Sequence, residues 1–335
     1  MKSEKRLLNN YFSHIYIEKE VLSSPVTEEI LKRLPNSKII EIKHYKDIFS
    51  RSRQSFSAQK KSPKLIIAKK ENQLIYKGSP MCEDFGNSRF FYTSNIMNCF
   101  YDCEYCYLQG MYSSANCVVF VNYEDYFNEV KKLLQEGPIY LCISYDTDML
   151  GFEKIVPLTE KWMEFARQNP SLKIEIRTKS AGFSYLENKK PSENIIFAWT
   201  LSPKSIIQSF EHGTPCLDLR LKNINMALDA GFPVRLCFDP LLYTENFEDI
   251  YGDFIKYVFE TVDGKRIFDV SIGVFRTSKD YLKKMRKERP DSLVLYYPYE
   301  TRGGVSSFKE KIAGEMIDYV YHLVSFYVDK KRIFI

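Results

Sequence analysis

Short apolar runs alternate with amphipathic segments along most of the chain, beginning near residue 89. The apolar runs predict strands over Phe90–Ser94, Cys117–Val121, Ile139–Ser144, Lys173–Arg177, Ile195–Leu201, Val234–Phe238 and Asp269–Phe275. The segments between them predict helices near Tyr123–Gln135, Leu158–Gln168, Asp218–Ala230, Phe247–Phe259 and Lys279–Lys287. This alternation is typical of parallel βαβ units with both sheet faces covered. It predicts an α/β fold, a partial barrel of about six units whose site lies at the carboxyl ends of the strands.

Two flanking segments depart from this alternation. Residues 1–88 are mixed and basic, with a clear apolar strand at Leu65–Ala68, and predict an N-terminal α/β extension that packs on the barrel. The barrel itself is expected to span residues 89–290. Residues 291–335 predict a C-terminal extension, with a helix around Phe308–Phe326 and a short strand at Arg332–Ile335.

Composition indicates a globular protein with a sizeable core. Apolar residues make up 44% of the 335, and 24 Tyr and 24 Phe contribute to an aromatic share of 15%. No apolar run reaches the ~18 residues of a membrane helix, and Met1–Asn10 lacks the apolar stretch of a secretory signal. We therefore expect a cytoplasmic protein with no membrane partner. In that compartment the eight cysteines are thiols or metal ligands rather than disulfides.

Basic side chains gather in two places, although the net charge is only +5. The two clusters are Arg51, Arg53, Lys60, Lys61, Lys64, Lys69 and Lys70, and Lys283, Lys284, Arg286, Lys287 and Arg289. Such clusters suit the phosphate backbone of a nucleic acid. A solvated helix face has the same composition, so both interpretations stay open.

The most informative stretch is a cysteine-rich loop after the first predicted barrel strand. Cys99, Cys103 and Cys106 have the spacing Cys-x3-Cys-x2-Cys. Three thiolates this close can each bind a different iron of one cubane cluster and leave the fourth iron open. The amino and carboxylate groups of S-adenosylmethionine fit that position, and reduction then cleaves its sulfonium to a 5′-deoxyadenosyl radical. The spacing therefore predicts a radical enzyme with a [4Fe-4S] cluster and S-adenosylmethionine.

A zinc site and a chance grouping are the alternatives for these three cysteines. A structural zinc site takes four ligands, but the next cysteine is Cys117 and no histidine lies nearby. A chance grouping of buried cysteines does not account for the aromatic Tyr107 after the last one, or for the position after a strand. Both alternatives fit the sequence less well than a cluster.

The loop with its continuation through Gln109 resembles the cluster loop of the radical S-adenosylmethionine superfamily. Further segments are similar to the spore photoproduct lyase family: Lys64–Ala68, Val119–Asp125, Asp148–Gly151, Arg177–Lys179, Ser209–Thr214, Ala230–Pro233 and Phe275–Thr277. The similarity covers nearly the whole chain and is thin before residue 60 and after residue 290. It implies the partial (β/α)6 TIM-like barrel of the radical S-adenosylmethionine type, with the C-terminal extension completing a lesion-binding face.

The resemblance implies a DNA repair enzyme, a carbon–carbon lyase. The family reverses the UV-induced spore photoproduct, 5-thyminyl-5,6-dihydrothymine, to two thymines. A deoxyadenosyl radical takes a hydrogen atom from the lesion, which fragments. The thymine radical then receives a hydrogen atom, usually from a cysteine, while two tyrosines relay the radical; Tyr105 and Tyr107 match those tyrosines. The implied partners are UV-damaged double-stranded DNA with the dimer flipped out and a reductant such as ferredoxin or flavodoxin, in the spore core or germinating cell.

The hydrogen donor is where the sequence departs from the family pattern. The position of the family's cysteine falls on Tyr145, and Cys142 lies three residues earlier. Because side chains alternate along a strand, this offset places Cys142 on the opposite face from Tyr145. Cys82 is the leading candidate, since its Pro- and Gly-containing loop can reach over a barrel mouth; Cys142 and Tyr145 stay open. The other cysteines are expected to be ordinary buried residues: Cys117, Cys216 and Cys237.

The resemblance also implies contacts at the ends of several barrel strands. The residues expected to bind the cofactor are Thr147, Asp148, Lys179, Thr200 and Ser202. Those expected at the lesion or the DNA are Tyr145, Arg276 and Arg302. A structural cap is the alternative role for each of them.

Two further functional classes stay open. A radical enzyme that modifies another nucleic-acid substrate, including a diverged relative, would share the cluster loop. Methylases and tRNA-modifying enzymes usually carry additional cysteines and RNA-binding segments, which we do not find in this sequence. A non-catalytic zinc or iron–sulfur module would need a fourth close ligand.

Overall fold

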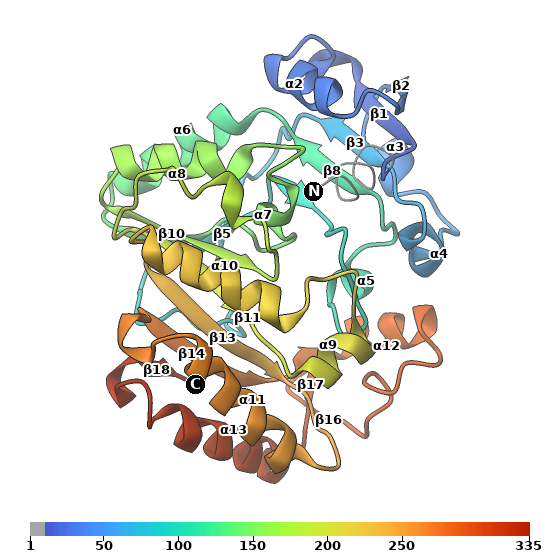
Figure 1. Cartoon of the computed structure of the whole chain (residues 1–335). Helices are drawn as coiled ribbons and strands as arrows, with labels where there is room; N and C mark the ends of the chain where they lie inside the picture. The colour runs from blue at the N-terminus through green and yellow to red at the C-terminus, as the bar shows by residue number, and fades with distance from the viewer. Residues whose placement is uncertain (1–10) are drawn as a thin grey trace.

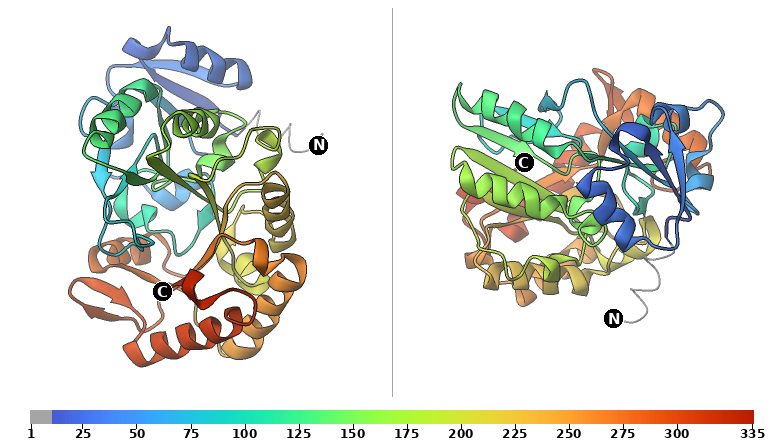
Figure 2. Two further views of the ribbon diagram at one scale, coloured as in Figure 1. Left: turned by 90° about the vertical axis from the view of Figure 1, so that its left-hand side faces the viewer. Right: turned by 90° about the horizontal axis from the view of Figure 1, so that it is seen from above.

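The computed structural model describes residues 11–335. Residues 1–10, on which the prediction about a secretory signal rests, lie outside the described residues. Two parallel-stranded sheets organise the chain, with the N-terminal segment and the C-terminal helix at opposite ends of the molecule (Figures 1 and 2). Among the described residues, no helix is long and apolar enough to cross a membrane.

The larger sheet is the partial barrel. Six of its parallel strands lie in the order β5 (Phe90–Thr93), β9 (Ile139–Cys142), β10 (Leu172–Thr178), β11 (Ile195–Thr200), β13 (Val234–Leu241) and β14 (Asp269–Val274). A seventh parallel strand, the short β18 (Ile333–Phe334), borders β14, and antiparallel β4 (Ile75–Lys77) borders β5. These two edges do not pair within residues 11–335, so the sheet stays open. The predicted fold class and the terminal strand are confirmed.

Helices cover the outer face of this sheet, where buried apolar side chains such as Leu141, Ile174 and Trp162 meet. The helices of this layer are α6 (Tyr123–Leu134), α8 (Leu158–Gln168), α10 (Leu217–Asp229), α11 (Phe247–Thr261) and α13 (Glu310–Val324). The remaining helices lie at strand ends: α5 (Leu108–Met111), α7 (Met149–Phe152), α9 (Lys204–Phe210) and α12 (Lys279–Glu288). The five predicted helices and the C-terminal helix are therefore present.

The second sheet belongs mainly to the N-terminal segment. Its order is β2 (Lys38–Ile42), β1 (His14–Glu18), β3 (Leu65–Ala68), β8 (Cys117–Phe120) and β6 (Ile96–Met97), with α2 (Pro25–Arg33), α3 (Lys46–Phe49) and α4 (Phe56–Lys60) beside it. The apolar run from Cys117 was expected in the barrel; it is a strand, but it pairs with β3 instead. Because β8 is buried on both faces like a barrel strand, its composition does not tell the two parallel sheets apart.

The two sheets exchange strands across residue 88, since β4 joins the barrel while β6 and β8 join the N-terminal sheet. The three-part division at residues 88 and 290 stays a prediction. Two smaller sheets complete the fold: β7 (Asp102–Cys103) with β12 (Glu211–His212), and β15 (Arg276–Ser278) with β17 (Val305–Ser307) and β16 (Glu300–Arg302). The 3-10 helices are Lys19–Val21, Phe183–Tyr185, Gly264–Arg266 and Lys330–Arg332.

Candidate active site

The cysteine loop runs from β6 to α5 at the carboxyl end of the barrel. Its entry is fixed by Asn98, which has a positive φ of 66° and whose buried amide donates to the carbonyls of Ser114 (2.7 Å) and Asn116 (2.8 Å). Asn tolerates this left-handed conformation better than most residues. Strand β7, which contains Cys103, pairs with β12. The loop is thus held by the barrel and by the segment after α9.

Side chains from distant segments hold the outer side of this loop. The Lys60 ammonium donates to the carbonyls of Cys99 and Tyr101, the latter at 2.6 Å. Arg289, just after α12, donates to the Asp102 carboxylate and to Gln109 Oε1 at 2.8 Å. Helix α12 also packs against α5, where a Cβ on Gly110 would lie 2.7 Å from the Tyr281 Cα. Helix α5 therefore needs glycine at position 110, because any larger residue would collide with the α12 backbone.

A second group of contacts fixes Glu104, between the last two cysteines. Its carboxylate accepts from Ser292 Oγ at 2.5 Å and lies 2.8 Å from His212 Nε2. Its backbone N–H donates to the Phe210 carbonyl at 2.8 Å. The loop is therefore bonded to three chain regions that are far apart in sequence, around Lys60, His212 and Arg289.

Two of the cluster cysteines are shielded from water, with Cys99 9% and Cys103 8% exposed, while Cys106 is partly buried. Burial raises the pKa of all three thiols, and that of Cys103 reaches about 12. The thiols lie close enough for the charge of Cys106 to raise the pKa of its two neighbours further. The ammonium groups of Lys60 and Lys179 act in the opposite direction and favour the thiolates. A cation bound by these sulfurs would favour deprotonation in the same way.

Tyr105 is locked into a buried charge network. Its hydroxyl donates to Glu211, which also accepts from Ser202 Oγ (2.9 Å) and from the Arg220 guanidinium. Burial opposes ionisation of Glu211, but attraction to Arg220 and Lys179 outweighs it and holds the pKa below its ordinary value. Glu211 is therefore an anion that orients Tyr105 beside the cluster loop.

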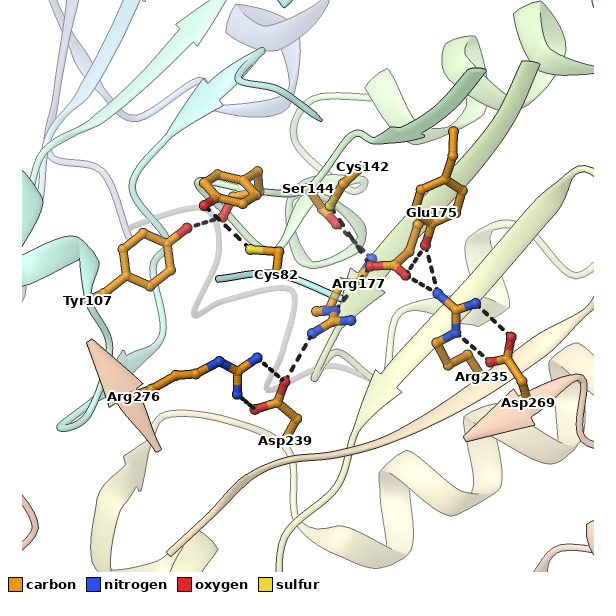
Figure 3. A network of polar contacts seen from close by, with 12 residues as sticks. Cys82, Tyr107, Cys142, Ser144, Glu175, Arg177, Arg235, Asp239, Asp269 and Arg276 are labelled. Carbon is orange, nitrogen blue, oxygen red and sulfur yellow. Dashed lines mark hydrogen bonds and ion pairs between the residues drawn. The ribbon is translucent and has the colours of Figure 1, made fainter. Parts of the chain in front are cut away.

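Tyr107, on the other side of Cys106, points to Tyr145. Its hydroxyl donates to the Tyr145 carbonyl at 2.6 Å, and the two rings lie 6.0 Å apart. The Tyr145 ring stacks on Tyr92 at 4.0 Å. The Cys82 thiol lies 3.7 Å from the Tyr145 hydroxyl. In Figure 3 the side chains of Cys82 and Tyr107 approach from opposite sides, and dashed lines mark these two contacts. The predicted donor and the predicted relay are thus brought together at Tyr145, the position of the family's cysteine.

The loop that carries Cys82 is anchored within the barrel sheet. The Arg276 guanidinium donates to the Met81 carbonyl at 3.0 Å and pairs with Asp239 at 3.2 Å (Figure 3). Three residues after Cys82, the ring of Phe85 lies 3.2 Å from the Arg235 guanidinium. The contacts of Arg276 thus position the Cys82 loop, and its expected contact with the lesion stays a prediction.

A buried ionic group lies beneath this loop. Glu175 on β10 accepts from Tyr140 and from Arg235, and Arg235 also pairs with Asp269. Arg177 donates from Nε to Glu175 at 3.1 Å. Burial opposes the charge of Glu175, but the two guanidinium groups prevail and lower its pKa to about 2. These strands therefore present charge to the barrel interior and apolar side chains to the helices.

The residues predicted to bind the cofactor have different surroundings. Both Asp148 oxygens are used within the protein, by the Gly151 N–H (3.0 Å), the Thr178 hydroxyl (2.7 Å) and the Lys179 N–H (2.6 Å). Asp148 is thus the N-cap of α7. By contrast, Thr147 Oγ1 is buried without a partner among residues 11–335. A buried hydroxyl without a partner is destabilising, and a bound ligand would satisfy it.

Lys179, Thr200 and Ser202 surround the Glu211 network. The Lys179 ammonium lies 5.5 Å from the Tyr105 ring centre. Burial opposes its charge, but attraction to Glu211 and Cys103 outweighs this and raises its pKa. The Thr200 carbonyl accepts from Arg220 at 3.1 Å. All three lie near Tyr105, although the Thr200 carbonyl and the Ser202 hydroxyl bind protein partners.

Three other predicted positions lie in different environments. Arg302 is on a hairpin with a side chain 63% exposed, where it pairs with Glu300 at 3.0 Å and with Glu310. The Cys142 thiol donates to Glu175 at 3.9 Å, whereas Cys82 contacts Tyr145. Cys216 was expected to be buried, but it is the exposed N-cap of α10; Cys117 and Cys237 are buried as expected. A single cysteine at a helix start has no pattern that distinguishes a cap from a core residue.

Two groups that organise the site were not predicted from the sequence. Glu211 belongs to the segment Ser209–Thr214 with family similarity, whereas Arg220 lies outside it. Neither residue shows its role in the sequence, because the need of one buried charge for the other appears only in the fold. Tyr92 was treated as part of an apolar strand, yet its ring supports Tyr145. The tyrosine-rich composition was the only signal for it.

Comparison with known proteins identifies the family to which this chain belongs. A family model for spore photoproduct lyase matches residues 11–292. The chain belongs to the spore photoproduct lyase family. A relative named spore photoproduct lyase from Bacillus subtilis (strain 168) is 23% identical over 264 residues, covering 76% of this chain and 74% of the relative. One from Clostridium acetobutylicum is 21% identical over 286 residues, covering 81% of each chain.

Solved structures of spore photoproduct lyase share the fold. A mutant with dinucleoside spore photoproduct is 18% identical, has a TM-score of 0.84 and covers 96% of this chain and 98% of its own. A double mutant with bound AdoMet and dinucleoside spore photoproduct is 19% identical, with a TM-score of 0.82 over 96% and 97% of the two chains. The predicted radical S-adenosylmethionine fold is therefore confirmed.

Proposed function

We propose that this member of the spore photoproduct lyase family is a DNA repair lyase that returns the methylene-bridged thymine dimer of UV-irradiated DNA to two thymines. The observation that carries the proposal is the meeting of Cys82, Tyr145 and Tyr107 beside the three-cysteine loop. A reaction that produces a thymine radical needs a hydrogen donor next to its radical source, and this geometry supplies one. The family match over residues 11–292 supports the same reaction.

The residues present fit the cofactors that the family implies. Three thiols from one loop can bind three irons of a [4Fe-4S] cluster, and Thr147 offers a free buried hydroxyl close to Asp148. Lys179 brings a positive charge to Tyr105, and such a charge would suit the carboxylate of S-adenosylmethionine. When bound, the cluster and S-adenosylmethionine supply the deoxyadenosyl radical that takes a hydrogen atom from the lesion.

The protein's own residues then control the product. The Cys82 S–H bond breaks and gives its hydrogen atom to the thymine radical, because an S–H bond is weaker than the C–H bond that forms, and Cys82 is left as a thiyl radical. Tyr145 holds the thiol through its hydroxyl, and Tyr107 is fixed to Tyr145 through its carbonyl. Cys82 must then regain a hydrogen atom, whose source is the methyl group of the 5′-deoxyadenosine formed earlier, and the two tyrosines beside the thiol, Tyr145 and Tyr107, are our candidates for passing it on. Tyr105, held by Glu211, stands on the other side of Cys106.

The substrate of this reaction would be damaged duplex DNA. A dimer inside the helix does not reach a buried site, so both thymines must be flipped out, at a cost of a few kcal/mol that the lesion itself reduces. Basic side chains such as Arg302, on the exposed hairpin, suit contacts with the flanking phosphates. The expected compartment and the reducing partner stay predictions.

An anaerobic repair assay tests the proposal. Reconstituted protein, dithionite and S-adenosylmethionine would be given the dinucleoside spore photoproduct, with products followed by chromatography. We expect intact thymine dinucleotide from the wild type and none from Cys99→Ala. Cleavage of S-adenosylmethionine with an unchanged dimer would mean that the substrate is another nucleic acid.

A further inference from the structure

The two basic clusters of the sequence meet in the folded chain. Ser57, on α4, donates from its backbone N–H to Glu288 Oε2 at 3.2 Å, at the carboxyl end of α12. The start of α4 and the end of α12 are therefore in contact, and both helices are on the same side of the molecule as α5 (Figure 1). Between Lys279 and Asp291 there are six basic and three acidic side chains. The exposed cations of both clusters flank this contact: Arg51, Arg53, Lys61, Lys283, Lys284 and Lys287.

Other members of the first cluster have different roles. Lys60 is bound to the carbonyls of the cysteine loop. Lys69 and Lys70 line a cavity of about 330 Å³ beside Tyr76 and Tyr92. Lys64 donates to Ser13 at 2.6 Å. The basic surface at α4 and α12 is thus a separate feature, which we name the α4–α12 face.

This face covers the outer side of the cysteine loop. Arg289 binds Asp102 and Gln109, and Ser292 binds Glu104, so the segment after α12 is bonded directly to residues around Cys103 and Cys106. Phe56 and Lys60 of α4 line a small hollow together with both of these cysteines. The groups that face the substrate, Tyr107 and Tyr145, are on the inner side. An electron can therefore arrive from the outside without entering the barrel.

Apolar side chains lie at the edge of the same face. Leu293, next to Ser292, is 80% exposed, and Tyr296 is 52% exposed with the Arg286 guanidinium 5.4 Å from its ring centre. An apolar patch with a charged surround is the usual anatomy of a protein interface. Electron-transfer complexes are small and transient, and complementary charge guides their encounter.

We propose that the α4–α12 face docks an acidic one-electron carrier protein of the flavodoxin or ferredoxin kind, with Leu293 and Tyr296 at its apolar contact. The carrier is oxidised by one electron, and the cluster held by Cys99, Cys103 and Cys106 is reduced by one. This inference rests on the proposed function, because it assumes a cluster that needs a reductant.

A charge reversal tests the docking face. The variant Lys283→Glu/Lys284→Glu/Lys287→Glu changes exposed side chains that make none of the loop contacts, and Lys311→Glu/Lys330→Glu/Lys331→Glu is the control with the same charge change elsewhere. Flavodoxin is the probe, and its affinity is measured by biolayer interferometry at low salt. We expect the α4–α12 variant to lose at least about tenfold in affinity, since like charges then face each other. The control should bind as the wild type does.

Three further measurements make the outcome decisive. Deoxyadenosine formation driven by reduced flavodoxin should fall in the variant, while the dithionite-driven rate and the affinity for damaged duplex stay unchanged. Unchanged flavodoxin affinity would overturn the proposal. Lost DNA affinity with unchanged flavodoxin binding would also overturn it and assign the face to DNA. If even the wild type forms no deoxyadenosine with dithionite, the proposed function fails, whereas the affinity measurement still decides the docking face.

Discussion

The Cys82 thiol and the Tyr145 hydroxyl lie 3.7 Å apart, although 63 residues separate them in the chain. Tyr145 in turn is placed by its stack on Tyr92 and by the hydrogen bond from Tyr107. At the scale of the residue, the proposed site is a thiol held by aromatic neighbours. Each neighbour can be tested through a different observable.

Cys82→Ala removes the proposed donor. We expect S-adenosylmethionine to be cleaved and the dimer to be opened, with trapped adducts in place of thymine and a fall of roughly tenfold or more in intact thymine dinucleotide. Chromatography with mass spectrometry resolves the products. Cys142→Ala is the matched control, because its thiol contacts Glu175. Normal thymine from Cys82→Ala, with adducts from Cys142→Ala, would move the donor to Cys142.

Tyr145→Phe keeps the ring that stacks on Tyr92 and removes the hydroxyl that meets the thiol. We expect near-normal cleavage of S-adenosylmethionine but a larger share of adducts, because the thiol is then less well oriented. The ratio of adduct to thymine is the measurement. Tyr76→Phe is a control, since this tyrosine stacks on the other side of Tyr92. An unchanged ratio in Tyr145→Phe would show that the hydroxyl has no part in the transfer.

The cysteines of the loop could be identified from the sequence, because their spacing is local. Cys82 could also be ranked first, but by loop position and by the alternation of strand faces, not by any contact. The pairing with Tyr145 depends on how residues 78–88 thread past β9, and no local pattern encodes that path. Arg276 illustrates the limit: its place at a strand end was visible, while its bond to Met81 was not.

At the scale of the element, the strand pattern predicted the barrel but not every partner. Strand β8 has the apolar composition of a barrel strand and lies in the other sheet. Strands β7 and β12 have two residues each, too few for a periodic signal, yet their pairing holds Cys103 in place. The buried Glu211–Arg220 pair joins β12 to α10 and stabilises that short ladder.

Removing one partner of this buried pair should be costly. In Glu211→Ala the Arg220 guanidinium is left buried and unpaired, and we expect the free energy of unfolding to fall by about 3–5 kcal/mol. Urea denaturation followed by fluorescence measures the change. Glu211→Gln, which can still accept hydrogen bonds, should lose less. Equal losses in the two variants would mean that the charge of Glu211, not its hydrogen bonding, is what matters at this position.

Low pH should destabilise the barrel, because Glu175 then becomes protonated and loses its attraction to the two guanidinium groups. Its pKa is about 2 in the folded chain, below the ordinary value of 4.5, so its stabilisation is present above about pH 4.5 and is lost as the pH falls toward 2. The difference in unfolding free energy between the wild type and Glu175→Gln should therefore shrink between about pH 6 and about pH 3. The exposed Glu164→Gln is the control and should show a much smaller change. A constant difference for Glu175→Gln would contradict the assignment.

At the scale of the whole molecule, the cysteine loop is where the N-terminal segment, the barrel and the region after α12 meet. The residues that bind it come from these three regions: Lys60, His212, and Arg289 with Ser292. This convergence could not be predicted from the sequence, because the two basic clusters are more than 200 residues apart in the chain. It makes the order of the loop depend on segments that contain none of its cysteines.

Arg289→Ala tests this dependence. Loss of its bonds to Asp102 and Gln109 should increase amide hydrogen exchange across residues 99–109, because local opening becomes easier when contacts are removed. Mass spectrometry of the protein without cofactors gives the readout. The exposed neighbour Lys287→Ala is the control and should leave exchange unchanged. Equal protection in Arg289→Ala and the wild type would show that the remaining contacts suffice.

The loop position of Cys82 has a consequence for the history of the site. A side chain on a strand is tied to the register of the whole sheet, whereas a loop can gain a thiol without disturbing any strand. Because a thiol at either place would face the same space, an ancestor that held both would have kept its repair activity while the strand cysteine was replaced. The strand cysteine can then be replaced by Tyr145 in a single substitution without loss of repair activity, because Cys82 already supplies the thiol.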